Sequence, residues 1–186
     1  MKLYEPFDFL TPEECQELIN IGRAKNPTPA KINKGTRRFE TGYGDDKERL
    51  CNISWYTDTK YKNKIQKVFQ HFDKTVLVLE DLQLSFYKHN DFFNWHKDTL
   101  YKPYGEIKYV RKFSMSIELQ SAPQAGLFLD SNVYPDIPRN EDLTIKIKPG
   151  QAFVFPSMDW HMAWNKGNEE RISLVAWAGH KNITKH

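Results

Sequence analysis

The segment Arg171-Ile172-Ser173-Leu174-Val175-Ala176-Trp177 reads as a β-strand, because successive side chains of a strand point to opposite faces of the sheet. Counting from Arg171, every second side chain lies on one face. That face is polar at Arg171 and Ser173 and apolar from Val175 to Trp177. The segment therefore predicts a strand that carries a polar patch where it begins.

Short segments of the same kind recur from residue 75 onward, each bounded by turn residues. This pattern is typical of an antiparallel β-sandwich or jelly roll. Beside 171–177, the predicted strands are 76–80, 82–89, 93–97, 112–119, 127–129, 143–146, 152–155 and 161–163. The segment 131–142 contains two prolines and several charges and is predicted to be a loop.

Before residue 75 the pattern indicates helices. Thr11-Pro12-Glu13-Glu14 combines an N-cap, a proline at the first helical position and a carboxylate at the third, which predicts a helix over 12–24. A second helix is predicted over 59–74, with its apolar residues on one stripe. We therefore expect one domain, 1–186, in which helical support of about residues 1–74 precedes a β core of about residues 75–180.

Two histidines and an aspartate form a candidate metal site. His96 and Asp98 are two positions apart, so on a strand they leave the same face and can reach one ion. A third ligand must come from a distant strand, and His161 can supply it. Two imidazoles and one carboxylate on one side of a metal are typical of non-haem Fe(II) oxygenases. The same ligands can hold other metals, so a zinc hydrolase, another oxygen-using enzyme or a binding module with a vestigial site stays open.

The polar patch on 171–177 suits an anion. A buried arginine is costly unless it meets one, and a guanidinium holds a carboxylate through two parallel hydrogen bonds. Arg171 follows His161 by ten residues, and Ser173 can add a hydroxyl to the same carboxylate. The implied anion is a small dicarboxylate that chelates the metal at one end and meets Arg171 at the other, as 2-oxoglutarate does.

The region from about residue 82 to residue 177 resembles the catalytic core of the 2-oxoglutarate- and Fe(II)-dependent dioxygenases, especially the prolyl 4-hydroxylase-like branch. The resemblance covers about half of the chain. The matching segments, in the order of the family, are 84–87, 92–98, 111–119, 148–157 and 161–177.

The resemblance implies a fold, a set of site residues and a reaction. The fold is α+β, mainly β: a double-stranded β-helix (jelly roll) with supporting N-terminal helices. His96, Asp98 and His161 would bind Fe(II), Arg171 would bind the distal carboxylate of 2-oxoglutarate, and Tyr87 would help to seat it. The reaction would use O2 to hydroxylate an unactivated carbon, with ascorbate as a candidate reductant.

Several positions depart from the pattern of the family. Glu118-Leu119-Gln120 stands where many relatives carry an aromatic residue followed by Leu-Asn, and Ala125-Gly126-Leu127 replaces the usual Gly-Gly-Glu, unlike a collagen-type hydroxylase. Trp177 stands six residues after Arg171, where related nucleic-acid demethylases carry a second arginine. Asp98 counts against the halogenating relatives, in which a small residue replaces the carboxylate.

We expect the substrate to be a prolyl residue in a peptide or protein. A free amino acid or another small molecule is the alternative. Aromatic faces suit the ring of proline, which makes Trp160, Trp164 and Trp55 candidate substrate contacts. Arg38 is a further candidate, in a segment, 37–44, that can form either a lid over the site or a solvated loop.

Composition favours a cytoplasmic protein with neither a nucleic acid nor a membrane as partner. The formal net charge is only +3, and no basic cluster of the kind that follows a phosphate backbone is present in the sequence. Two cysteines are too few for a disulfide framework, the N-terminus lacks an apolar leader, and no apolar run spans a bilayer. Nothing in the sequence predicts the oligomeric state.

Overall fold

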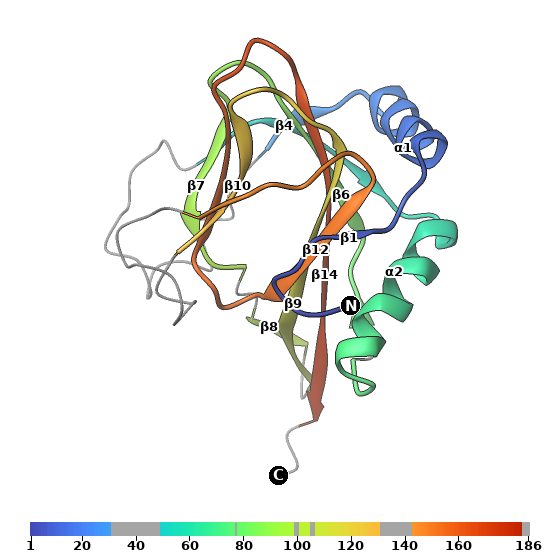
Figure 1. The fold of residues 1–186 in the computed structure, drawn as a ribbon. Coiled ribbons are helices and arrows are strands. Elements are labelled where there is room, and N and C mark those ends of the chain that lie inside the picture. The colour runs from blue at the N-terminus through green and yellow to red at the C-terminus, as the bar shows by residue number, and fades with distance from the viewer. Residues whose placement is uncertain (31–48, 77, 99–100, 105–106, 131–142, 184–186) are drawn as a thin grey trace.

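The structure is a computed structural model that describes residues 1–30, 49–76, 78–98, 101–104, 107–130 and 143–183. Two antiparallel sheets face each other, and the described helices lie together on the outer side of one of them (Figure 1). This arrangement is a double-stranded β-helix, or jelly roll, and it confirms the predicted α+β, mainly β class.

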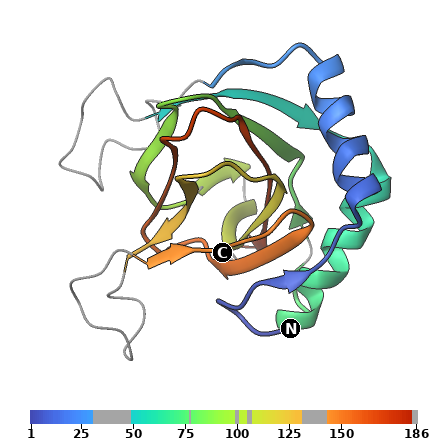
Figure 2. The same ribbon diagram turned by 45° about the horizontal axis from the view of Figure 1, so that its top comes forward.

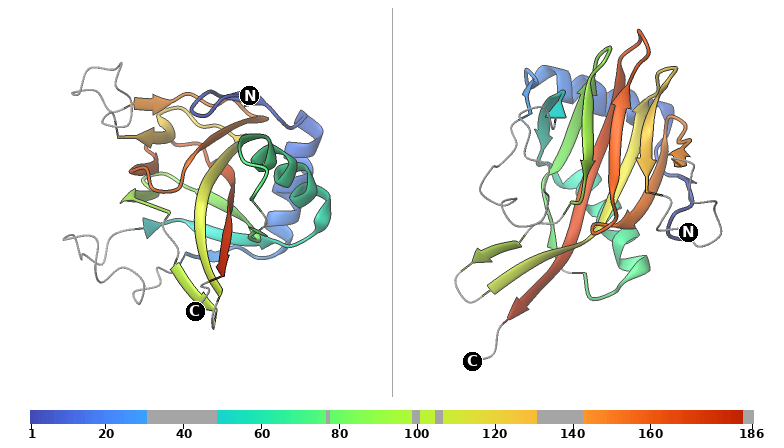
Figure 3. Two further views of the ribbon diagram at one scale, coloured as in Figure 1. Left: turned by 90° about the horizontal axis from the view of Figure 1, so that it is seen from below. Right: turned by 90° about the vertical axis from the view of Figure 1, so that its left-hand side faces the viewer.

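The larger sheet has nine strands. These are β1 (Phe7–Asp8), β2 (Thr28–Pro29), β4 (Asn52–Tyr56), β5 (Val78–Leu79), β6 (Leu82–Tyr87), β8 (Tyr101–Tyr104), β9 (Ile107–Gln120), β12 (Gln151–Pro156) and β14 (Arg171–Ile183). Their order is β1-β12-β9-β14-β6-β4-β2, with β5 paired to β14 and β8 paired to β9. The right-hand view of Figure 3 shows β9 and β14 extending together past the end of the smaller sheet.

The smaller sheet has five strands, in the order β11-β10-β13-β7-β3. They are β3 (Arg49–Leu50), β7 (Phe92–His96), β10 (Ala125–Leu129), β11 (Leu143–Ile145) and β13 (His161–Asn165). Figure 2 looks along the space that the two sheets enclose, with the helices outside it.

The two helices follow their sequence signals closely. Helix α1 spans Pro12–Ala24, as predicted, and Thr11 and Glu14 form the complete capping box at its start. Helix α2 spans Thr59–Phe72 and ends two residues before the predicted end at 74. Gly22 lets α1 lie close to the larger sheet, since a Cβ atom there would be only 2.9 Å from the ring of Phe86.

The strands β6, β9 and β14 lie side by side in the larger sheet and present two different faces. The outer face is apolar and packs under α1 and α2; it carries Leu82, Leu84, Phe86, Phe113, Met115, Ile117, Leu119, Ile172, Leu174 and Ala176. The inner face turns toward the smaller sheet, and its buried polar residues are Gln83, Ser85, Ser114, Ser116, Glu118, Arg171 and Ser173. The main hydrophobic core therefore lies outside the jelly roll, under the helices, and leaves the interior free for a polar site.

The N-terminal part of the chain contributes more than helical support. Within about residues 1–74, β1, β2 and β4 are strands of the larger sheet and β3 is a strand of the smaller one. The sequence pattern predicted none of these four strands. Three of them have two residues each, too few to show alternation. The predicted loop 131–142, the segment 37–44 and Arg38 lie outside the described residues.

Among the described helices, none has the length and apolar character needed to cross a membrane.

Candidate functional site

The two histidines of the predicted triad are neighbours across the smaller sheet. His96 is the last residue of β7 and His161 is the first residue of β13, and the two are paired in the register of these strands. Asp98 lies two residues past the end of β7, where its backbone N–H donates to the Ser157 carbonyl at 2.9 Å. The sequence predicted that strand alternation would place this carboxylate, but β7 ends before Asp98, and the backbone contact with Ser157 positions it instead.

The three side chains converge on one point. The Nε2 atom of His96 lies 3.5 Å from Asp98 Oδ1, and that of His161 lies 3.3 Å from Asp98 Oδ2. One ligand atom from each residue falls within a group no wider than 4.8 Å. All three residues are buried, with exposed fractions of 4–6%. The fold therefore brings together in space the three residues that the sequence analysis selected.

Hydrogen bonds around the triad orient its donor atoms. His96 Nδ1 lies 2.7 Å from the Asn94 carbonyl, and His161 Nδ1 lies 2.9 Å from the Asp159 carbonyl. A carbonyl only accepts, so each Nδ1 carries the proton and each Nε2 keeps a free lone pair for a metal. This second layer of contacts was not predicted, because backbone carbonyls leave no trace in the sequence.

Asp98 is held by a hydroxyl chain. Ser114 Oγ donates to Asp98 Oδ2 at 2.7 Å, and Ser157 Oγ lies 2.9 Å from Ser114 Oγ. Both serines are fully buried. The chain leaves Oδ1 free of this contact, which suits a carboxylate that binds a metal through one oxygen.

The electrostatics of the triad favour a cation. Burial lowers the pKa of His96 to about 4, so its imidazole is neutral near pH 7. Burial raises the pKa of Asp98, but the two imidazoles outweigh it and hold that pKa well below its usual value. Burial lowers the pKa of His161, but Asp98 reverses this effect and raises it. A metal cation would replace the proton that Asp98 otherwise draws onto His161.

Arg171, which the sequence predicts to bind a carboxylate of the co-substrate, is buried and has a partner that was not predicted. Arg171 begins β14 and is 1% exposed. Its Nε and Nη2 atoms donate to the two carboxylate oxygens of Glu118 at 3.0 and 2.8 Å. The third nitrogen, Nη1, is buried and has no hydrogen-bond partner among the described residues. Glu118 therefore fixes one edge of the guanidinium and leaves the other available.

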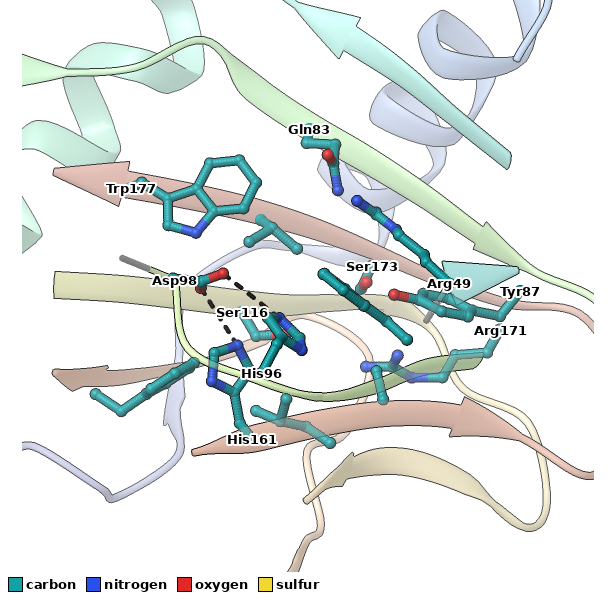
Figure 4. Close-up of a pocket in the computed structure, with 15 residues that line it drawn as sticks. Arg49, Gln83, Tyr87, His96, Asp98, Ser116, His161, Arg171, Ser173 and Trp177 are labelled. Carbon is teal, nitrogen blue, oxygen red and sulfur yellow. Dashed lines mark ion pairs between the residues drawn. The ribbon is translucent and has the colours of Figure 1, made fainter. Parts of the chain in front are cut away.

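The triad and the clamp line one pocket between the two sheets, as Figure 4 shows. Ser173 and Tyr87, both predicted as co-substrate contacts, also line it, and the Arg171 guanidinium lies 5.4 Å from the centre of the Tyr87 ring. The pocket has the His96, Asp98 and His161 triad at one end and, at the other, a guanidinium edge that no described residue accepts from, so its donors fit both Fe(II) and a short dicarboxylate.

Sequence reasoning missed several residues of this pocket, among them Arg49, Gln83 and Ser116, although it placed Trp177 on the same strand face as Arg171. A signal existed for two of them. In β6 and β9 a polar residue occupies every second position beside apolar neighbours, which marks a buried polar face. No such signal existed for Arg49, which lies on a two-residue strand.

The three substrate candidates within the described residues, Trp55, Trp160 and Trp164, are not among the residues that line the pocket. Trp55 is 44% exposed, and its ring centre lies 6.4 Å from that of Trp177. Trp160 and Trp164 are half-buried, with Lys97 and Lys166 over their rings at 5.2 and 4.0 Å. Trp55 thus packs beside a pocket-lining ring, and substrate contact by all three tryptophans stays a prediction.

No protein-family model matches this chain, and no curated protein does. Solved structures match it over nearly its whole length. One is the viral collagen prolyl hydroxylase vCPH from Paramecium Bursaria Chlorella virus-1 in its 2OG complex, with a TM-score of 0.67 and 20% identity over 96% of this chain and 97% of that one.

Two further structures agree with this match. A prolyl-4-hydroxylase from Pseudomonas putida gives a TM-score of 0.66 at 16% identity, over 96% of this chain and 92% of that one. An oxidoreductase of the 2OG-Fe(II) oxygenase family from Burkholderia pseudomallei gives 0.64 at 12% identity, over 97% of this chain and 88% of that one. The chain therefore has the fold of the 2OG-Fe(II) oxygenases, as the resemblance over residues 82–177 predicted.

Proposed function

We propose that this protein is an Fe(II)- and 2-oxoglutarate-dependent dioxygenase that hydroxylates an unactivated carbon. The observation that carries the proposal is the pairing, in one pocket, of a buried two-histidine, one-carboxylate triad with a buried guanidinium that has a free donor. A zinc hydrolase or a binding module on the same fold would leave the free edge of Arg171 without a purpose.

Each residue of the site then has a defined task. His96, Asp98 and His161 would hold Fe(II) from one side and leave the opposite positions for ligands. Arg171 and Ser173 would orient 2-oxoglutarate by its distal carboxylate. Bound iron would supply the chemistry that consumes O2: one oxygen atom would enter succinate as 2-oxoglutarate loses carbon dioxide, and the other would enter a C–H bond of the substrate as a hydroxyl group.

Aromatic rings shield the triad from water. Phe93 stacks on His96 with ring centres 3.4 Å apart, and Phe155 meets His161 edge to face at 4.8 Å. These contacts fix the imidazole planes, and they keep that side of the metal site apolar. A dry site protects a reactive oxidant from side reactions.

The substrate that we propose is a prolyl residue in a peptide or protein. Two of the solved structures with this fold are prolyl hydroxylases by name. The exposed Trp55 ring beside the pocket-lining Trp177 offers an apolar platform of the kind that a pyrrolidine ring packs against. A free amino acid or another small molecule is the second candidate, since the departures at 118–120 and 125–127 separate this chain from collagen-type hydroxylases.

Succinate release from 2-oxoglutarate, measured with Fe(II) and ascorbate, tests the reaction. We expect wild-type turnover with one of the two substrate classes and none in His96→Ala. A matched control is His71→Ala, because His71 is an exposed histidine on α2, away from the pocket. If iron-loaded wild type and His96→Ala were equally inert with every substrate supplied, the oxygenase proposal would fail.

Parallel reactions with proline-containing peptides and free amino acids test the substrate. Mass spectrometry of the products should show a gain of one oxygen on a prolyl residue of a peptide. Hydroxylation of free amino acids alone would reject the peptide proposal and favour the small-molecule alternative.

A further inference from the structure

The clamp residue Arg171 does not bring a net positive charge to the pocket. Its exposed fraction is 1% and that of Glu118 is 3%, so the two opposite charges cancel inside the protein. The free edge of the guanidinium still offers well-oriented donors. A carboxylate that docked there would nevertheless add a buried negative charge with no cation of its own to balance it.

A second arginine reaches the same pocket from the smaller sheet. Arg49, on β3, lines the pocket, and its guanidinium lies 4.4 Å over the ring of Phe93. Its Nε atom donates to Cys51 Sγ at 3.2 Å, whereas its Nη2 atom is buried without a hydrogen-bond partner in the described part of the chain. No carboxylate among the described residues pairs with it. Within these residues, the positive charge of Arg49 thus has no carboxylate partner, and its Nη2 atom has no hydrogen-bond acceptor.

Both arginines lie at the Tyr87 end of the pocket. Tyr87 has the Arg171 guanidinium 5.4 Å from its ring centre, and it packs in one cluster with Cys51, which accepts the hydrogen bond from Arg49. In Figure 4 the hydroxyl groups of Tyr87 and Ser173 lie between the two guanidinium groups. Arg49 and Arg171 each have one guanidinium nitrogen without a hydrogen-bond partner among the described residues, and they line the same pocket as the hydroxyl groups of Tyr87 and Ser173.

We propose that Arg49 and Arg171 together bind the distal carboxylate of 2-oxoglutarate, and that Glu118 is a positioning residue that holds Arg171 in place. This inference rests on the proposed dioxygenase function. Two arginines and one glutamate give this end of the pocket a net charge of one positive unit, which matches one carboxylate. Glu118 also reduces the repulsion that two neighbouring guanidinium groups would otherwise have.

Calorimetric titration of the Mn(II)-loaded protein tests the inference without any turnover. The titrants are 2-oxoglutarate and pyruvate, which has the same keto acid and no distal carboxylate. We expect Arg49→Gln to bind 2-oxoglutarate about 10- to 100-fold more weakly, as the loss of a charge-assisted hydrogen bond predicts, with an unchanged affinity for pyruvate. Arg49→Lys, which keeps the charge, should lose less.

Arg23→Gln is the matched control. Arg23 is an exposed arginine that pairs with Glu170 at 2.9 Å, so its loss removes the same charge outside the pocket. Its affinity for 2-oxoglutarate should equal that of wild type.

The variant Arg49→Gln/Glu118→Gln separates a charge effect from a structural one. It restores the net charge of the wild-type pocket, and the amide oxygen introduced by Glu118→Gln can still accept from Arg171. We expect it to bind 2-oxoglutarate more tightly than Arg49→Gln alone. A double variant as weak as the single one would overturn the charge role.

The remaining outcomes distinguish this inference from the proposed function. If Arg49→Gln bound 2-oxoglutarate like wild type, or lost pyruvate affinity to the same extent, the role of Arg49 would be rejected while the dioxygenase proposal stood. If Mn(II)-loaded wild type did not bind 2-oxoglutarate, both would be rejected.

Discussion

The ion pairs between the two helices and the ion pair at the pocket have similar N···O distances, but the first are exposed to solvent and the second is buried. Between α1 and α2, Lys64 lies 2.9 Å from Glu14 and Lys60 lies 2.6 Å from Glu17, and these side chains are 25–55% exposed. In the pocket, Arg171 lies 2.8 Å from Glu118, with side chains 1% and 4% exposed. Distance alone therefore does not distinguish the two sets, but their solvent exposure does.

The comparison shows that the two sets serve different purposes. An exposed pair is screened by water and salt and contributes about 0–1 kcal/mol to stability. A buried pair loses the hydration of both charges, and apolar residues of similar volume are often as stable or more so. The helix pairs thus contribute little to stability, whereas the pocket pair agrees with the ligand binding that we propose for it.

Glu118→Ala should have the largest effect on stability. It leaves the Arg171 guanidinium buried without its partner, which costs about 3–5 kcal/mol in the free energy of unfolding. Urea denaturation of the variant and of Glu17→Ala, its exposed counterpart, measures the difference. Equal losses in the two variants would contradict the comparison.

Replacing both members of the buried pair should reverse the sign of this effect. In Glu118→Leu/Arg171→Met the pocket has no buried charge at this position, so we expect stability equal to wild type or up to about 4 kcal/mol higher. Calorimetry should at the same time detect no 2-oxoglutarate binding. A destabilised double variant would mean that the pair is needed for folding.

Ser114→Ala tests the buried contacts at the metal end. The change removes the hydroxyl that donates to Asp98 Oδ2 at 2.7 Å. The loss of such a partner typically lowers metal affinity by about 10- to 100-fold. Competition with a metal-binding dye measures the affinity, and Ser121→Ala, an exposed serine just beyond β9, is the control. Unchanged affinity would show that Ser157 and the histidines orient Asp98 without Ser114.

Glu14→Gln should have the smallest effect, about 0.2–1 kcal/mol at pH 7, and less at high salt. The hydrogen bond from Lys64 lowers the pKa of Glu14 below 4.5 in the folded protein. Its contribution is therefore fully present above the unfolded pKa and is lost as pH falls through the folded one. Denaturation of wild type and variant at pH 7 and at about pH 3 should show a smaller difference in the free energy of unfolding at the lower pH. A difference that grew on acidification would contradict this assignment.

The elements that could be predicted are those with local signals. The capping box at Thr11 and Glu14 placed the start of α1, and apolar periodicity placed its end. The second helix ends at Phe72 because the Asp73 side chain accepts the backbone N–H of Thr75 and turns the chain, a contact that periodicity does not report. The long strands follow from alternation, whereas β3 and β4 exist because of their partners β7 and β6.

The site divides in the same way. His96, Asp98, His161 and Arg171 were identifiable because their chemistry is rare at such spacing in a β-rich chain. Arg49 was not, because nothing near it in the sequence indicates that it faces a pocket.

By itself the sequence determined the helices, the strands with clear alternation, the three metal-ligand candidates and the arginine that faces the interior. These features depend on the conformation of a few consecutive residues, which local side chains specify. The tertiary structure decided that β9 places Glu118 beside Arg171, through the pairing of Glu118 with Ser173, and that β3 brings Arg49 to the same pocket. Strand order and register depend on contacts between residues far apart in the chain, so local pattern cannot specify them.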